Sequence, residues 1–104
     1  MMHSFSSGNK SDAAVIAREV QRTVKASPLY KVLLHNDPIN TMDYVAETLR
    51  AVLPQLSEQD AIKIMLDAHN LGVGLVIVCD LEPAEFYSES LKSKGLTSTI
   101  ELES

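Results

Sequence analysis

The chain has 104 residues, which is enough for one folded domain with one apolar core and too few for two. Apolar residues make up 45% of it, as in ordinary globular proteins, so we expect a packed core. No apolar run approaches the ~18 residues that a membrane-spanning helix needs. The net charge of −5 argues against nucleic-acid binding, because affinity for phosphate comes from clustered lysine and arginine.

The N-terminal quarter differs in composition from the rest. Residues 1–28 carry four basic and two acidic side chains, whereas residues 29–104 carry five basic and twelve acidic ones. The serine-rich start contains no apolar segment of a signal peptide, which favours a cytoplasmic protein, or an organellar one whose transit peptide is missing here. Weak helical spacing over residues 13–26 ends at Ser27-Pro28, where extended backbone is favoured. We therefore expect a flexible extension over residues 1–28 and a folded domain over residues 29–104.

The first part of the folded domain is predicted to be a strand, a loop and a helix. Residues 30–35 are typical of a strand, and the turn-forming residues 36–40 follow it. Apolar residues at helical spacing then predict a helix from residue 42, with Thr41 as its N-cap and Pro54 after its end.

A second helix, a strand, a third helix and a last strand are predicted in the rest of the domain. Ser57 and Asp60 form a variant of the capping box at the start of a second helix, and Gly72 ends it. We then expect a buried strand over residues 75–79, a third helix capped by Asp80 and ending at Gly95, and a last strand over residues 96–102. The order β-α-α-β-α-β predicts a single α+β two-layer domain, in which a three-stranded antiparallel sheet packs against three helices.

Few residues are candidates for chemistry. His35-Asn36-Asp37 stands at a strand end, and His69 lies near a helix C-terminus, where a protonated imidazole is favoured. Taken alone, each is better explained by an ordinary structural role, turn formation or partial burial. Cys79, the single cysteine, is expected to be a small core residue. No metal-ligand spacing, phosphate-binding glycine loop or nucleophile–base set occurs, so the residues favour a binding domain without cofactor over an enzyme.

Several segments, in order and at matching spacing, resemble the ClpS adaptor family. They are Tyr30 to Asp37, Met42 to Val45, the Ile64-Met65-Leu66 helix with His69 and Gly72, Glu82 to Glu85, and Gly95-Leu96-Thr97. The resemblance covers residues 29–103 and implies the fold derived above, which is similar to the C-terminal domain of a ribosomal stalk protein.

The resemblance implies an adaptor that binds proteins whose free N-terminal residue is large and apolar, and delivers them to a ClpA- or ClpC-type AAA+ unfoldase. By position, Asn36, Asp37 and His69 would bind the substrate's α-amino group, which is cationic below its pKa of ~8 and offers three donors. The implied pocket for the first side chain comprises Ile39, Asn40, Met42, Val45, Met65, Ala68 and Ser98.

This sequence departs from the family pattern around that pocket. Pro38 stands where the family usually has a second acidic residue, and Ile39-Asn40-Thr41 replaces a common Tyr-Thr-Pro. Ala68 replaces a valine that commonly precedes the helix histidine, which enlarges the pocket. We expect an intact amine site with an altered preference for the first side chain.

Two features bear on the expected unfoldase partner. Glu82 lies where the family carries an acidic docking residue, although an acid in a first helical turn also stabilises the helix by itself. Residues 1–28 resemble the family's variable extension in position, which implies a role in delivery rather than in binding. We expect a monomer with no metal and no cofactor.

Three alternatives remain open from the sequence. The chain could dock on the unfoldase and redirect or inhibit other substrates. It could share the fold as an interaction domain without N-degron binding, modulating the unfoldase or another partner. A small hydrolase using His35 or His69 would need a nucleophile and an orienting group that the sequence does not identify.

Overall fold

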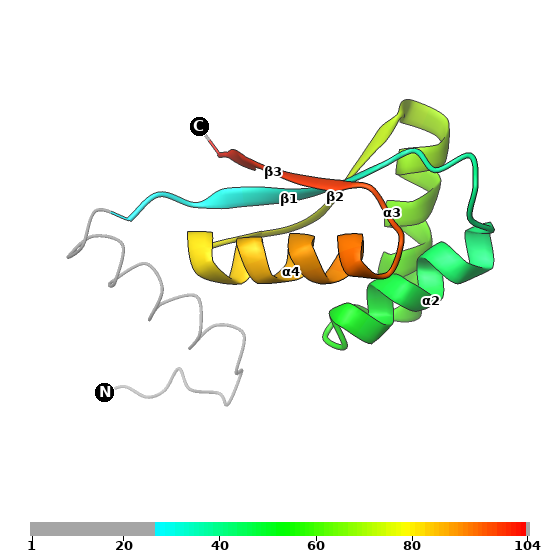
Figure 1. Cartoon of the computed structure of the whole chain (residues 1–104), viewed down its shortest axis with the longest axis horizontal. Coiled ribbons are helices and arrows are strands. Elements are labelled where there is room, and N and C mark those ends of the chain that lie inside the picture. The colour runs from blue at the N-terminus through cyan, green and yellow to red at the C-terminus, as the bar shows by residue number, and fades with distance from the viewer. Residues whose placement is uncertain (1–26, 104) are drawn as a thin grey trace, which may run out of the picture.

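The computed structural model describes residues 27–103 (Figure 1). In chain order they form β1 (Tyr30–His35), α2 (Met42–Val52), α3 (Glu58–Leu71), β2 (Val73–Cys79), α4 (Leu81–Ser93) and β3 (Ser98–Leu102). The predicted β-α-α-β-α-β order is confirmed. The helical spacing of residues 13–26 and most of the expected extension lie outside the described residues.

The sheet has the order β2-β1-β3, with β1 in the centre and antiparallel to both neighbours. Helices α3 and α4 pack against the strands, and α2 packs against α3 and α4 (Figure 1). The register of β2 shifts between Val32 and Leu33 of β1, which leaves Val76 as the extra residue of a bulge.

One contiguous core lies between the sheet and the helices, because each element buries one face. The largest fully buried side chains are Leu34, Leu49, Leu53, Leu91 and Val32. Cys79 is also buried in this cluster, as expected of a small core residue. The buried residues of α3 are Ala61, Ile64, Met65 and Ala68, whose spacing places them on one face of the helix.

Local capping signals set three of the helix ends that the structure describes. The Thr41 hydroxyl accepts a hydrogen bond from the Tyr44 N–H at the start of α2, and Ser57 forms the predicted capping box with Asp60 at the start of α3. Gly72 ends α3 with a φ of 92°, in the left-handed region that glycine tolerates. These three predictions are confirmed.

The structure corrects the starts of two predicted strands and the way in which Asp80 caps α4. Asp80 precedes α4 as its N-cap residue, but its side chain makes no capping hydrogen bond. Strand β2 begins at Val73 rather than at Leu75, because His35 pairs with Val73 and Leu34 with Gly74. Strand β3 begins at Ser98 rather than at residue 96.

A close approach between α3 and β2 fixes where α3 lies on the sheet. A Cβ added to Gly74 would lie 2.5 Å from the carbonyl oxygen of Ile64 and 3.3 Å from the backbone nitrogen of Ala68. The first distance is well below van der Waals contact, so only glycine allows the α3 backbone to approach this strand so closely.

We predict that Gly74→Ala destabilises the domain by about 1–3 kcal/mol, because the added methyl group must push α3 away from β2. Urea denaturation followed by circular dichroism measures this loss. Leu75→Val is a matched control on the same strand, since that side chain is half exposed, and its stability should change by less than about 0.5 kcal/mol. An unchanged midpoint for Gly74→Ala would contradict the packing argument.

Candidate functional site

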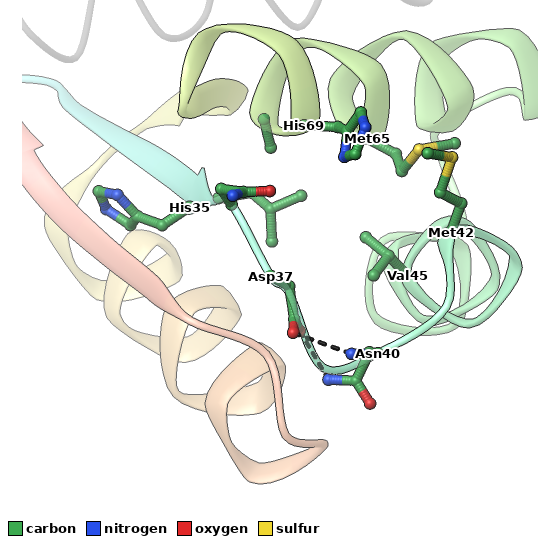
Figure 2. A pocket seen from close by; sticks show the side chains of 10 residues that line it. His35, Asp37, Asn40, Met42, Val45, Met65 and His69 are labelled. Carbon is green, nitrogen blue, oxygen red and sulfur yellow. Dashed lines mark hydrogen bonds between the residues drawn. The ribbon is translucent and has the colours of Figure 1, made fainter.

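A pocket opens at the end of β1, between the loop that follows this strand and helices α2 and α3 (Figure 2). It holds about 260 Å³ of empty space, including the space open to solvent at its mouth. Its lining residues are Leu34, His35, Asn36, Asp37, Asn40, Met42, Val45, Met65, Ala68 and His69. Three separate segments of the chain therefore meet here.

Most residues predicted from the sequence to form a site come together in this pocket. All three predicted amine-binding residues, Asn36, Asp37 and His69, lie in its wall. So do five of the seven predicted for the side-chain pocket: Asn40, Met42, Val45, Met65 and Ala68.

The structure does not bring the other two side-chain residues to the pocket wall. Ile39 is 87% exposed on the outside of the loop. Ser98 is 2% exposed, and its hydroxyl accepts a 3.0 Å hydrogen bond from Ser88 between α4 and β3. Its partner across the sheet is Leu34, which the sequence analysis did not single out and which itself lines the pocket.

One side of the pocket is apolar. Helix α3 contributes Met65 and Ala68, which are buried and lie three residues apart on one face of the helix. Helix α2 contributes Val45, which is buried, and Met42, which is 43% exposed at the rim. Met42 and Met65 are flexible thioethers from different helices, and both line this side of the pocket.

The Asp37 carboxylate is held in place by the loop itself. Its Oδ1 accepts hydrogen bonds from the backbone N–H groups of Ile39, at 2.8 Å, and Asn40, at 2.9 Å. Its Oδ2 accepts a 2.6 Å hydrogen bond from the Asn40 side-chain amide. Pro38, which follows Asp37, carries no N–H of its own, so the backbone donors to this carboxylate are those of the next two residues.

These hydrogen bonds affect the charge of the carboxyl group. Burial raises the pKa of Asp37, but the bonds from the Asn40 side chain and from the two backbone N–H groups lower it by more, so the pKa lies below the ordinary 3.8. Asp37 is therefore a carboxylate at neutral pH. The stability that it contributes is present above the ordinary pKa and is lost as the pH falls through the lowered value.

A backbone hydrogen bond between the end of β1 and the end of α3 brings Asn36 and His69 to the same pocket. The Asn36 N–H donates a 3.1 Å hydrogen bond to the carbonyl of Gly72, which joins the end of β1 to the end of α3. Because His69 precedes Gly72 by three residues, this junction brings His69 to the loop. Neither the Asn36 side chain nor the His69 imidazole has a hydrogen-bond partner within residues 27–103, and both residues are exposed.

His35 lies in the pocket wall but its imidazole is already engaged. Its Nε2 lies 2.7 Å from the Thr99 hydroxyl on β3, and its backbone N–H donates to the Thr97 carbonyl at 2.9 Å. His35 therefore helps to hold the sheet at the edge of the pocket.

Glu82 lies apart from this pocket, exposed in the first turn of α4. Strand β2 ends just before α4 at Cys79, which pairs with Tyr30 at the start of β1, whereas the pocket adjoins His35 at its end. Five steps along a strand span roughly 17 Å. In Figure 1 the start of α4 likewise lies at the end of the sheet away from α2.

The arrangement combines polar acceptors with an apolar wall, which suits a ligand that has a cationic or donor-rich end next to an apolar group. Among residues 27–103, no three potential ligands gather that could hold a metal ion. None of the helices that the structure describes has the length and apolar content to cross a membrane.

Comparisons with known proteins agree on one family. The family model for the ATP-dependent Clp protease adaptor protein ClpS matches residues 25–99. The ATP-dependent Clp protease adapter protein ClpS of Synechococcus sp. strain CC9902 is 70% identical over 91 residues, which are 88% of each chain. That of Prochlorococcus marinus strain MIT 9515 is 67% identical over 94 residues, which are 90% of each.

A solved structure gives the same result from the fold. The structure of Agrobacterium tumefaciens ClpS2 bound to L-phenylalaninamide is similar with a TM-score of 0.67 and 35% identity, over 74% of this chain and 99% of that one. The ClpS family is one of adaptors and not of enzymes, which confirms the prediction of a non-catalytic binding domain. The chain belongs to the ClpS family and is an adaptor of the ATP-dependent Clp protease.

Proposed function

We propose that this adaptor binds the free N-terminal residue of a substrate protein in the pocket at the end of β1, and delivers that protein to a Clp unfoldase. The observation that carries the proposal is the meeting of Asn36, Asp37 and His69 beside the apolar wall of one pocket. The resemblance to ClpS2 of Agrobacterium tumefaciens supports it, because the ligand in that structure, L-phenylalaninamide, has a free amine next to a benzyl group.

The polar side of the pocket suits an α-ammonium group. This cation carries three N–H donors, and Asp37, which lines the pocket, is an anion. The Asn36 amide oxygen and one ring nitrogen of His69 are the further acceptors in the wall. Hydrogen bonds between ionised groups are roughly twice as strong as neutral ones, so an amine would be strongly preferred to an acetylated N-terminus.

The apolar side suits a large apolar first residue. Burying a leucine or phenylalanine side chain against Met42, Val45 and Met65 contributes roughly 1.5–3 kcal/mol. The bulk of Met42 at the rim is proposed to disfavour β-branched residues such as isoleucine and valine. Ala68, with the smallest side chain in the apolar wall, leaves additional room for the ligand.

We predict that a fluorescent peptide beginning with leucine binds at least about 100-fold more tightly than its N-acetylated twin, because acetylation removes the charge and two donors. Fluorescence anisotropy measures both affinities. Asp37→Ala should weaken binding of the free-amine peptide roughly 10–100-fold, the loss expected for hydrogen bonds to charged groups.

Glu103→Ala serves as a control for charge alone, since it removes one exposed carboxylate at the end of β3, outside the pocket. Its affinity should match that of the unaltered protein. Equal binding of both peptides, or binding of neither, would overturn the proposal and favour an interaction domain that shares the fold without the amine site.

Ala68→Val tests the side-chain preference. We predict that the two added methyl groups weaken binding of a peptide beginning with phenylalanine roughly 5–10-fold more than one beginning with leucine, because the larger ring meets the filled space. Ala51→Val is the matched control, on an exposed position of α2 that does not line the pocket. The same loss for both peptides would contradict a size-selecting role for Ala68.

Residues outside the pocket are proposed to deliver the bound substrate to the unfoldase. We propose that Glu82 at the start of α4 contributes to docking on a ClpA- or ClpC-type unfoldase, and that residues 1–28 act in substrate transfer. The separation of Glu82 from the pocket supports a division of the two tasks, since both partners could then bind together. We further propose that the protein is a cytoplasmic monomer that binds neither nucleic acid nor membrane.

We predict that a protein retaining residues 28–104 binds the leucine peptide with unchanged affinity but no longer accelerates its degradation. The pocket lies wholly within the residues retained, which is the reason for expecting unchanged affinity. A degradation assay with the unfoldase, its protease and a substrate beginning with leucine measures delivery. Acceleration equal to that of the full chain would refute the role assigned to the extension.

A further inference from the structure

The side chain of Asn40 bridges the binding loop and the turn between α4 and β3. Its amide nitrogen donates to Asp37 Oδ2 at 2.6 Å and to the carbonyl oxygen of Gly95 at 3.1 Å. A primary amide has two hydrogens, so both are used. Figure 2 shows the Asp37 side chain turned towards Asn40, with His69 on the opposite side of the pocket.

These bonds limit how Asp37 can meet a ligand. A carboxylate has about four acceptor positions, two on each oxygen. The backbone N–H groups of Ile39 and Asn40 fill those of Oδ1, and the Asn40 amide fills one on Oδ2. One acceptor position, on Oδ2, is left for an incoming donor.

We propose that Asn40 is a positioning residue for recognition of the N-terminal amine: its amide, anchored on Gly95, holds the Asp37 carboxylate so that one position of Oδ2 receives the ammonium group. The inference rests on the proposed function and assigns Asn40 a polar role in place of the apolar contact predicted from the sequence. The two other ammonium hydrogens then require acceptors elsewhere, which Asn36 and His69 supply.

The turn between α4 and β3 is also hydrogen-bonded to Tyr44 of α2, and this bond does not involve Asp37. The Tyr44 hydroxyl donates a 2.6 Å hydrogen bond to the carbonyl oxygen of Lys94, the residue before Gly95. Tyr44→Phe therefore removes a tie between the two segments and leaves the carboxylate bonds in place. It is the matched control for a general loosening of the loop.

The test compares the unaltered protein with the Asn40→Ala and Tyr44→Phe variants in two measurements. The first is the affinity for the free-amine leucine peptide, by fluorescence anisotropy. We expect Asn40→Ala to weaken it about 5–20-fold, as for disruption of a charge-assisted hydrogen bond, and Tyr44→Phe to change it less than about twofold. Circular dichroism establishes that each variant is folded.

The second measurement is the pKa of Asp37 in the unliganded protein, from ¹³C NMR of its carboxyl carbon as the pH is varied. The Asn40 amide favours the ionised form, so Asn40→Ala should raise the pKa of Asp37, whereas Tyr44→Phe should leave it unchanged. A stabilising bond elsewhere in the loop would not move this value.

The outcomes separate this inference from the proposed function. If the unaltered protein binds free and acetylated peptides equally, the proposed function fails and this role fails with it. If the unaltered protein prefers the free-amine peptide, the proposed function stands and the variants test Asn40 alone. The positioning role is then overturned if Asn40→Ala binds that peptide as tightly as the unaltered protein, or loses no more affinity than Tyr44→Phe. It is also overturned if Asn40→Ala leaves the pKa of Asp37 unchanged.

Discussion

The site depends on the close contact between α3 and β2 at Gly74. Because that residue has no side chain, the backbone of α3 lies directly against the strand, 2.5 Å from the place a Cβ would occupy. The contact fixes α3 next to β1, since Gly74 pairs with Leu34 of β1, and so sets the position of Met65, Ala68 and His69 relative to the loop after β1. A larger residue would displace one entire wall of the pocket.

The other wall is held by hydrogen bonds instead of apolar packing. The loop after β1 is joined to Gly72 through the Asn36 N–H and to Gly95 through the Asn40 side chain. Both glycines have a φ of 92°, and each follows a helix, so the loop is fastened to the ends of α3 and α4. An apolar helix face set by packing thus meets a polar loop set by directional bonds, which is the combination that a charged end and an apolar side chain on one ligand require.

Sequence reasoning succeeded where the signals are local. Thr41, Ser57 and Gly72 cap helix ends through contacts within a few residues. The spacing of the apolar residues in α3 identifies its buried face. It failed where contacts between distant residues determine the structure. Strand β2 begins at Val73 because His35 of β1 pairs with that residue. Ser98 lies away from the pocket because its hydroxyl bonds to Ser88 of α4. The hydrogen bond from the Asn40 side chain to the Gly95 carbonyl joins residues 55 positions apart, so no local pattern could reveal it.

One pocket is proposed to bind a free amine and an apolar side chain of the same ligand together. The most direct measurement is NMR of the Met42 and Met65 methyl groups during titration with leucinamide and with N-acetyl-leucinamide. Both methyl signals are expected to shift with leucinamide and not to shift with the acetylated compound at the same concentration. Equal shifts with both compounds, or shifts with neither, would contradict it.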